Sequence, residues 1–420
     1  MKRQVSCVAL LIIGLCLVSP VLAFDCADPL GCVEVAPGDT IVLGAMLTYS
    51  GANAFFGEDS LGGIELAILD RGGEVLGREI ELTGADDQCT SEGGQAAGQR
   101  MASDRTIVGI IGPSCTSAAQ GALPIISEAG MLTISPTNTA PELTNADTDS
   151  GGAWRPGYYR ITPNDRFQGL LVGQFAYRVL GARRVATVHD GGTYTESLTG
   201  IMRETFLELG GEVVFQGSIN VGDVDMTAVL TEVAASGPDI LFAPFFPPES
   251  EFITAQMASI SGLEDTVIMV ADASLVNSYA PNTGEAALGA YLSGPNITGE
   301  KYEALLKAWE DEFGGRPPSS FHAHAYDATN LVLNAVEKVA IEADDGTLFI
   351  GRQAMREAVN AVENYDGVTG NLTCLDESPY AGDCGNPESL AVFQITEAVL
   401  YDGLWPPPAI WDLSMLPKDS

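Results

Sequence analysis

Two turns rich in hydroxyl and amide side chains follow two consecutive predicted strands. The first turn, residues 114–117, comes after the apolar run 107–111, and the second, residues 137–139, comes after the run 131–135. Both turns lead into a predicted helix start, where free backbone N–H groups and hydroxyls can hold an anion such as a carboxylate. Helix capping alone explains any single such turn. The repetition favours a binding cleft, because ligands of open α/β sheets bind beyond the carboxyl ends of the strands.

Known catalytic signatures do not occur in the chain. The sequence contains no GxSxG, HExxH, Walker A or GxGxxG pattern, and it has three histidines. Asp86 and Asp87 could be read as paired catalytic acids. Neighbouring residues on a strand point to opposite faces, however, so we prefer to interpret them as a strand-end turn. We therefore expect a binding protein rather than an enzyme, and no cofactor.

Two patterns resemble metal sites without completing one. Asn145, Asp147 and Asp149 have the one-three-five spacing of a calcium loop, but the glycine required at the sixth position and the later glutamate ligand are missing. His322 and His324 fall on a predicted helix that points their rings apart. A solvated loop and a helix start are the preferred interpretations, and no metal site is expected.

Composition indicates a large, well-packed globular protein. The chain has 420 residues, of which 46% are hydrophobic and 18% are charged, so it is long enough for two domains. Its 20 basic and 56 acidic side chains give a net charge of -36. That charge argues against nucleic acid or an anionic membrane as a partner.

The N-terminus has the features of a secretory signal peptide in the right order. A basic pair precedes the apolar run 8–18, and residues 21–23 form a cleavage site that ends at Ala23. We predict cleavage after Ala23 and a mature protein that is periplasmic or otherwise extracytoplasmic. The large residues before Cys16 and Cys26 argue against a lipid anchor, and no later stretch reaches the roughly 18 apolar residues of a membrane helix.

Cysteine spacing favours three disulfides in the exported protein. Cys7 and Cys16 leave with the signal peptide, and six cysteines remain in an oxidising compartment. Six cysteines allow fifteen pairings. Local spacing favours two close pairs and leaves a third, namely Cys26 with Cys32, Cys374 with Cys384, and Cys89 with Cys115. A nucleophilic Cys115 or a zinc site is the alternative, and no CxxC or paired histidine supports it.

A repeated βα pattern positions the two hydroxyl-rich turns. The first series of apolar strands covers residues 41–47, 79–83, 107–111 and 131–135, with helices between them. The pattern restarts at Arg183 with strands at 185–189, 212–215, 240–246 and 267–272. Such alternation predicts parallel sheets with helices on both faces, and hence two α/β lobes. Further helices are expected at 300–313, 321–341 and 352–362, and late strands of the second lobe at 370–374 and 390–395.

Four segments carry motifs of one known family. They are DDQC at 86–89, CTSAAQ at 115–120, ISPTNTAPELT at 134–144 and HDGGTYTESL at 189–198. In this order they resemble the periplasmic leucine/isoleucine/valine-binding proteins of ABC importers, from about residue 41 to the C-terminus. The resemblance implies an α/β fold of two doubly wound Rossmann-like lobes joined by a three-stranded hinge, the type I periplasmic binding protein fold. It also supports the pairing of Cys89 with Cys115.

The resemblance implies that the chain crosses between the lobes three times and that the helices within 300–341 return to the first lobe. We therefore expect a signal peptide at 1–23, a disulfide-stapled leader at 24–40, lobe 1 at 41–160 plus 296–362, lobe 2 at 161–295 plus 363–410, and a C-terminal tail at 411–420.

The resemblance also assigns ligand-binding residues on the first lobe. Thr116 and Thr139 stand where hydroxyls of the family hold the α-carboxylate of the ligand, and Thr137 and Asn138 belong to the same turn. Threonine in place of serine keeps the hydrogen-bond donor. Tyr194 stands where a tyrosine lines the second lobe.

Departures from the family pattern lie on the remaining walls. Asp272 falls where the family has a glutamate for the α-ammonium, which preserves the charge but shortens its reach. Phe56, and either Phe245 or Phe246, occupy positions filled by tyrosine, so the wall loses hydroxyls and becomes more apolar. We expect an aliphatic or aromatic amino acid as ligand, with amides, short peptides and amino-acid derivatives as alternatives.

The function implied by the resemblance is capture of an amino acid and its delivery to an ABC transporter permease by a monomeric protein. A ligand-sensing exported domain that acts through a partner is one rival interpretation. An enzyme built on the same fold is another, and it would need a catalytic constellation that the sequence lacks.

Overall fold

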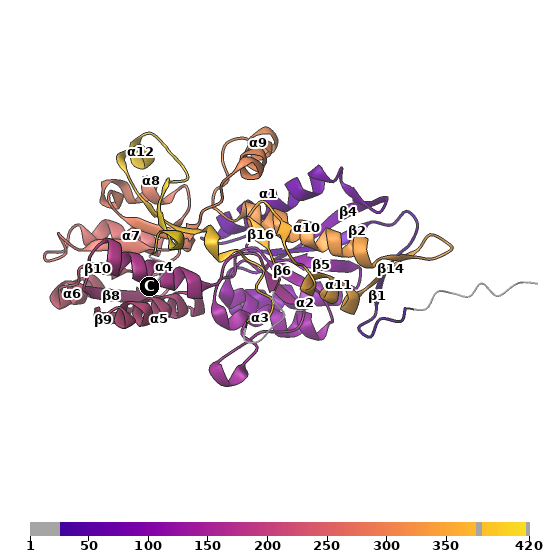
Figure 1. Cartoon of the computed structure of the whole chain (residues 1–420), viewed down its shortest axis with the longest axis horizontal. Coiled ribbons are helices and arrows are strands. Elements are labelled where there is room, and N and C mark those ends of the chain that lie inside the picture. Colours follow the sequence, from indigo (N-terminus) through magenta and orange to yellow (C-terminus); the bar gives the residue numbers. More distant parts are fainter. Residues whose placement is uncertain (1–25, 375–379, 417–420) are drawn as a thin grey trace, which may run out of the picture.

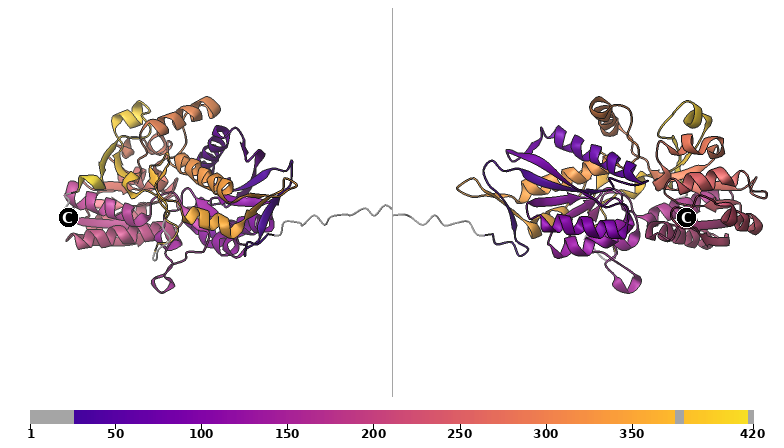
Figure 2. Two further views of the ribbon diagram at one scale, coloured as in Figure 1. Left: turned by 45° about the vertical axis from the view of Figure 1, so that its right-hand side comes forward. Right: turned by 180° about the vertical axis from the view of Figure 1, so that it is seen from behind.

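The computed structural model describes residues 26–374 and 380–416, which form two α/β lobes lying side by side (Figures 1 and 2). The predicted signal peptide and its cleavage site fall outside these residues. No helix in the described part of the chain is long and apolar enough to cross a membrane.

Lobe 1 is built on a six-stranded sheet with the order β3-β4-β2-β5-β6-β7. All neighbouring strands are parallel except β3 and β4. The strands are β2 (Ile41–Leu47), β3 (Glu74–Val75), β4 (Arg78–Asp86), β5 (Ile107–Ile111), β6 (Thr133–Ser135) and β7 (Tyr158–Arg160). Every residue of β5 is buried, as expected of a central parallel strand covered on both faces.

Helices cover both faces of the first sheet. One face is covered by α2 (Ser91–Ser103) and α3 (Thr116–Glu128), and the other by α1 (Ala54–Asp70), α10 (His322–Val339) and α11 (Arg352–Asn360). Helix α9 (Glu300–Phe313) packs beside α1. Gly94 allows α2 to approach α3 closely, because a Cβ there would lie 2.0 Å from the carbonyl oxygen of Ala118. This contact fixes the start of α3 relative to the strand ends.

Lobe 2 is built on a seven-stranded sheet with the order β18-β17-β12-β11-β10-β8-β9. The strands β8 to β12 are parallel, whereas β17 and β18 run antiparallel to their neighbours. The strands are β8 (Arg184–His189), β9 (Glu212–Ser218), β10 (Ile240–Phe242), β11 (Val267–Val270), β12 (Tyr291–Pro295), β17 (Leu390–Gln394) and β18 (Ala409–Asp412).

The helices of lobe 2 also form two layers. One layer contains α4 (Asp165–Gln174), which continues as the π-helical turn Phe175–Val179, and α5 (Thr193–Glu208). The other contains α6 (Thr227–Ser236), α7 (Glu249–Met257), α8 (Tyr279–Thr283) and α12 (Glu397–Tyr401). Each layer buries its own apolar cluster against the sheet, so this lobe is doubly wound.

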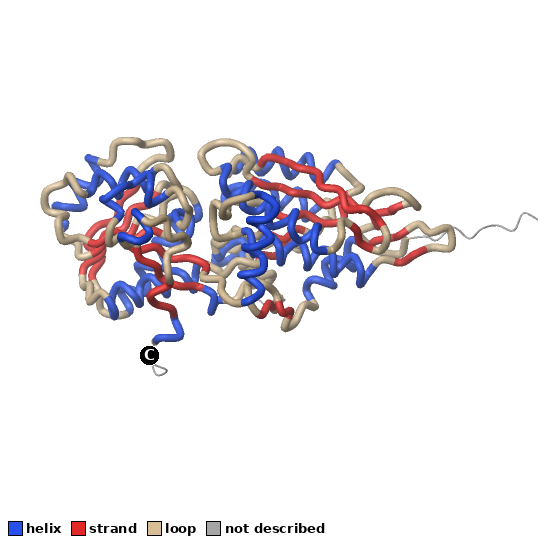
Figure 3. Tube along the Cα trace, turned by 90° about the horizontal axis from the view of Figure 1, so that it is seen from above, coloured by secondary structure: helices blue, strands red, loops and turns tan. Residues whose placement is uncertain are grey.

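Three chain segments join the lobes. They are residues 161–164 after β7, residues 296–299 after β12, and residues 385–389 directly before β17. Viewed from above, the strands of the two lobes form separate groups with connecting segments between them (Figure 3). The predicted fold of two doubly wound lobes is confirmed.

The predicted late strand at 370–374 does not join the second sheet. Among the described residues, β16 (Asn371–Leu372) pairs only with β15 (Tyr365–Asp366), and Leu372 packs in the core of lobe 1 together with the disulfide-bonded Cys374 and Cys384. The adjacent Asp383 forms an ion pair with Arg160 of β7 at 2.5 Å. These contacts hold the segment on lobe 1, although we expected it in lobe 2.

The two ends of the described chain are both part of the fold. In the leader, β1 (Cys32–Val35) pairs with β14 (Leu348–Gly351), which also pairs with β13 (Ile341–Glu342), at the end of lobe 1 distant from lobe 2 (Figure 1). At the other end, β18 pairs with β17, so residues 411 and 412 of the expected tail belong to the sheet of lobe 2. All three predicted disulfides are present, including the Cys26–Cys32 pair of the leader.

Candidate functional site

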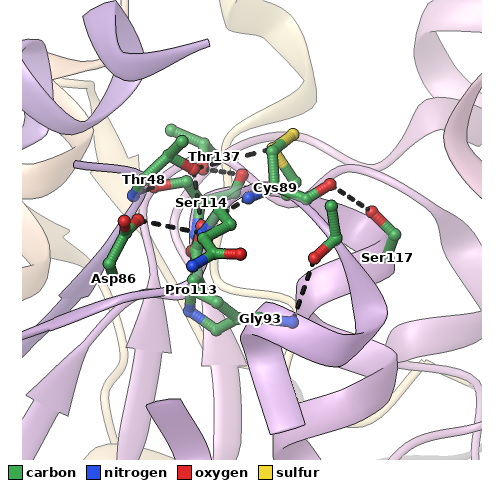
Figure 4. The surroundings of a disulfide bond; sticks show 12 residues. Thr48, Asp86, Cys89, Gly93, Pro113, Ser114, Ser117 and Thr137 are labelled. Atoms are coloured by element: carbon green, nitrogen blue, oxygen red, sulfur yellow. Dashed lines mark hydrogen bonds between the residues drawn. A yellow bond between two sulfur atoms is a disulfide. The ribbon is translucent and has the colours of Figure 1, made fainter. Parts of the chain in front are cut away.

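Asp87 holds together the strand ends on lobe 1. Its carboxylate accepts hydrogen bonds from the Thr48 hydroxyl at 2.5 Å, the Ser114 N–H at 2.7 Å and the Cys89 N–H at 3.0 Å. Burial raises the pKa of Asp87, and the three donors oppose that rise. The disulfide between Cys89 and Cys115 joins the same turns (Figure 4). Asp87 is thus a structural acceptor, which agrees with the strand-end interpretation.

The second hydroxyl-rich turn is bonded to the first. The Thr137 hydroxyl donates to the Ser114 carbonyl, and the Ser135 hydroxyl donates to the Pro113 carbonyl at 2.8 Å. The Ser135 oxygen in turn accepts the N–H groups of Thr137 and Asn138 at 3.2 and 3.0 Å. The two turns therefore form one rigid wall.

This wall presents Thr116 and Thr139 to a small cavity. Thr116 is the first residue of α3, where free N–H groups and the helix dipole favour an anion. Both threonines line the cavity, and each is 3% exposed. The N-cap of α3, Cys115, makes no capping hydrogen bond with its side chain.

The facing wall, on lobe 2, centres on the carboxylate of Asp272. This residue follows β11, and its Oδ1 accepts hydrogen bonds from the Tyr194 hydroxyl at 2.6 Å and the Gln168 Nε2 at 2.7 Å. Gln168 also donates to the Ser293 hydroxyl at 3.1 Å. Burial raises the pKa of Asp272, and the two side-chain donors lower it. The wall is therefore acidic, and its donors stabilise the ionised form of Asp272.

Aromatic rings from both lobes fill the space between the walls. The centroid of the Phe56 ring lies 5.8 Å from the ring centroids of Phe246 and Phe321. The ring centroids of Phe246 and Tyr194 are 5.3 Å apart. The cavity that remains has a volume of about 20 Å³. That is space for about one water molecule and far below the roughly 300 Å³ of a small ligand pocket. Ligand entry therefore requires the lobes or these rings to move.

Most of the predicted site residues meet at this cavity. Seven of them line it, namely Phe56, Thr116, Thr137, Thr139, Tyr194, Phe246 and Asp272. Two do not. The side chain of Asn138 accepts a hydrogen bond from the Tyr158 hydroxyl at 3.1 Å, and Phe245 is fully buried in the core of lobe 2. Phe246, the next residue along the chain, faces the cleft instead.

Asp165 is a buried carboxylate that we did not predict as a site residue, and it is bonded to the cavity-lining Thr139 without lining the cavity itself. It is the first residue of α4 and is 0% exposed, and its backbone N–H donates to the Thr139 carbonyl at 2.9 Å. Within the described residues, neither carboxylate oxygen of Asp165 has a hydrogen-bond partner. Burial, followed by the charge of Asp272, raises the pKa of Asp165 well above its usual value. The Thr139 hydroxyl lowers this pKa without reaching hydrogen-bonding geometry.

Four further cavity or wall residues were missed. Ser114, Ala273 and Phe321 line the cavity, and Gln168 bonds to Asp272 from one turn beyond Asp165. The available signal was the segment NDRFQG at 164–169, in which Asn164 caps α4 at the first crossing between the lobes. A helix that starts at a crossing brings its first turn close to the cleft.

A much larger cavity lies elsewhere. Its volume is about 610 Å³, and it lies between α9 and the segment around Trp405. The basic residues at its edge, Lys307 and Arg316, are exposed. We assign the site to the smaller cavity, because there the buried polar groups converge from the strand ends of both sheets.

The two metal-like patterns have structural explanations. His322 and His324 are buried at the start of α10, where the carboxylate of Asp59 accepts the Phe321 N–H at 2.9 Å and lies 3.2 Å from His322 Nδ1. Burial lowers the pKa of His324 to about 3. In the loop, the Asp147 side chain accepts the N–H of Asp149 at 3.0 Å. Over residues 26–374 and 380–416, no three candidate ligands are grouped around a common point.

The sequence is similar to those of known periplasmic and amino acid binding proteins. A family model described as periplasmic binding protein matches residues 40–386. An amino acid binding protein of Pseudomonas aeruginosa is 28% identical over 313 residues, which cover 73% of this chain and 80% of the relative. The leucine-, isoleucine-, valine-, threonine-, and alanine-binding protein of the same organism is 27% identical over 342 residues, covering 80% and 85%.

Solved structures share the fold. A leucine-binding protein from Thermotoga maritima has a TM-score of 0.74 at 23% identity, covering 85% of this chain and 96% of its own. A solute-binding protein of an ABC transporter from R. palustris, in complex with benzoate, has a TM-score of 0.72 at 21% identity, covering 89% and 95%. At these identities the likeness shows the arrangement of the two lobes and no more.

Proposed function

Because this chain belongs to the periplasmic binding protein family, we propose that it captures an apolar α-amino acid between its lobes and delivers it to the permease of an ABC transporter. Its place of action is outside the cytoplasm, as in the family. The family consists of substrate-binding proteins, and we propose no catalytic activity for this chain.

The observation that carries this proposal is that an anion-binding wall on lobe 1 and a carboxylate on lobe 2 face each other across one cavity. On lobe 1, Thr116, Thr139 and the N-terminus of α3 suit the α-carboxylate of the ligand. On lobe 2, the buried carboxylate of Asp272 suits the α-ammonium, with Tyr194 holding it in place. An α-amino acid bears both groups on one carbon, so it can bridge the two walls and hold the cleft closed.

The ring cluster supports an apolar ligand side chain. The cavity wall contributed by Phe56, Phe246 and Phe321 offers no hydrogen-bonding group of its own. A leucine, isoleucine, valine or phenylalanine side chain fits such a lining, and the names of the relatives include three of these residues.

A simple carboxylic acid is the main rival ligand, because several solved neighbours hold benzoate, 4-hydroxybenzoate or 3,4-dihydroxybenzoic acid. Such a ligand satisfies the lobe 1 wall but brings no cation to Asp272. A buried carboxylate that stays ionised without a counter-charge is strongly unfavourable. The acidic wall therefore favours an amino acid over its deaminated analogue.

Calorimetry of the mature protein with leucine, isoleucine, valine and phenylalanine tests the proposal. Each amino acid is paired with its 2-hydroxy or 2-keto analogue, which has the same shape but lacks the ammonium group. We expect at least one amino acid to bind and its analogue to bind at least tenfold more weakly, a difference of about 1.4 kcal/mol. A deaminated acid that binds as tightly as its amino acid contradicts the proposal. Mass spectrometry of small molecules released on denaturation identifies the natural ligand.

A further inference from the structure

Two buried carboxylates, Asp165 and Asp272, lie on the same side of the cleft. The helix α4 links them, because Asp165 begins it and Gln168, one turn later, donates to Asp272 Oδ1 at 2.7 Å. Neither residue forms an ion pair with any described lysine, arginine or histidine. The exposed fraction is 0% for Asp165 and 4% for Asp272.

The two carboxylates differ in their hydrogen bonds. Asp272 accepts two from side-chain donors, those of Tyr194 and Gln168, and these stabilise its ionised form. Both oxygens of Asp165 are buried without a partner. If one of the two carboxyl groups is neutral in the empty cleft, Asp165 is therefore the one that holds the proton.

The charged and titratable groups around the pair do not neutralise it. Arg160 of β7 acts on Asp165, but its guanidinium already bonds to Asp383 at 2.5 Å and to the Ala140 carbonyl at 2.7 Å. Glu142 adds a further acidic group, and burial raises the pKa of the Glu142 carboxyl. Tyr194 of α5 faces both carboxylates, and burial raises the pKa of its hydroxyl well above the usual value, so it stays a neutral donor.

We propose that Asp165 and Asp272 together form the cation subsite of the cleft, that Asp165 holds a proton when the cleft is closed and empty, and that the ammonium of the ligand displaces this proton. The displaced proton passes to the solvent, and no other bond changes. The chemical class of the ligand rests on the proposed function, whereas the proton on the empty pair does not.

The proposal makes binding depend on pH. Since each bound ammonium releases a proton, the affinity rises as pH rises, up to the raised pKa of the empty pair. A ligand without a cationic nitrogen displaces no proton and gains nothing from higher pH. The second carboxylate thus discriminates against deaminated acids.

Calorimetry in buffers of different ionisation enthalpy counts the protons. With leucine, or whichever amino acid of the panel binds, we expect release of about one proton per ligand near neutral pH. Asp165→Asn should bind at least tenfold more weakly and release close to none. Binding of the amino acid to the wild-type protein with no proton released overturns the proposal.

Thermal unfolding of the ligand-free protein gives a test that needs no ligand. A carboxyl whose pKa is raised in the folded state contributes stability at low pH that is lost as pH rises through that pKa. Asp165→Asn lacks this loss, so its unfolding temperature should exceed that of the wild type by a margin that grows as pH rises above about 4, the ordinary pKa of an aspartate. A difference that stays constant with pH overturns the proposal.

Asp327→Asn is the matched control for the unfolding test. Asp327 is buried too, but it accepts hydrogen bonds from the Thr369 N–H and hydroxyl and from the Val368 N–H. Burial raises the pKa of Asp327 as well, but the variant takes the acceptor from these three donors, so it should unfold at a lower temperature than the wild type at every pH. If no amino acid binds but the difference in unfolding temperature between Asp165→Asn and the wild type still grows with pH, the proposed function is wrong. The proposal that Asp165 is protonated in the empty cleft is then still supported.

Discussion

Asp87 on lobe 1 and Asp165 on lobe 2 are both buried carboxylates beside the cleft, and they differ in their partners. Asp87 accepts three hydrogen bonds from neighbouring strand ends, whereas neither oxygen of Asp165 has a partner in the described chain. Burial of a charge is tolerated when donors surround it and is costly when they do not. The hydrogen bonds of Asp87 therefore stabilise lobe 1. On lobe 2, the burial of Asp165 without donors costs free energy, and a cationic ligand can remove that cost.

Two other buried carboxylates behave like Asp87. Asp59 accepts the Ser319 and Phe321 N–H groups at the start of α10, and Asp327 accepts donors from Val368 and Thr369. Each ties together segments distant in the sequence. The absence of donors, rather than burial or charge, therefore marks Asp165 as functional in our proposal.

The largest expected effect concerns the stability of lobe 1. Asp87→Ala leaves three buried donors without an acceptor and should lower the free energy of unfolding by about 4 kcal/mol or more, as measured by urea denaturation. Asp86→Ala is the matched control, because Asp86 is more exposed and water can replace its bonds to Tyr49 and Ser50. Equal losses in the two variants would show that Asp87 has no special structural role.

The next effect concerns ligand binding at the opposite wall. Asp272→Asn keeps the shape of the side chain and removes its charge, so it should weaken amino acid binding by about 2 to 5 kcal/mol in calorimetry. The free energy of unfolding should change much less than in Asp87→Ala. Unchanged affinity for the amino acid would remove Asp272 as the ammonium partner, and the amino acid assignment with it.

A smaller effect separates two threonines of the lobe 1 wall. Thr116→Ala should weaken binding by about 1.5 to 3 kcal/mol, because it removes one hydrogen bond to a charged group. Thr137→Ala is the matched control, since the Thr137 hydroxyl donates to the Ser114 carbonyl and supports the turn. It should reduce stability by about 1 kcal/mol with little direct effect on affinity. If Thr137→Ala loses more affinity than Thr116→Ala, the hydroxyl that contacts the ligand is that of Thr137 and not that of Thr116.

The sequence was sufficient for the architecture because the βα alternation extends along both lobes. Period-two and period-3.6 patterns locate strands and helices, and parallel strands bring successive turns to one edge. The segment 370–374 could not be placed this way. Its five residues, GNLTC, are compatible with either sheet, and the ion pair of Arg160 with Asp383 and the Cys374–Cys384 disulfide decide its position.

The site was predictable where a side chain follows a regular strand. Thr116 and Thr139 were found because hydroxyls after strand ends are visible in the sequence. Asp165 was missed because an aspartate at the start of a helix is what ordinary helix capping also produces. Only the folded structure reveals that its oxygens lack partners.

The smallest effect tests the pair Phe245 and Phe246, which the sequence could not separate. Strand β10 ends at Phe242, so the alternation of faces no longer applies when the chain reaches them. Phe246→Leu removes ring contacts with Phe56 and Tyr194 and should weaken binding by about 1 kcal/mol, since aromatic pairs contribute about 0.5 to 1.5 kcal/mol each. Phe245→Leu, in the core of lobe 2, should cost up to about 1.5 kcal/mol of stability and leave affinity unchanged, as measured by denaturation and calorimetry. If Phe245→Leu weakens binding more than Phe246→Leu does, the aromatic wall of the cleft has been assigned to the wrong ring.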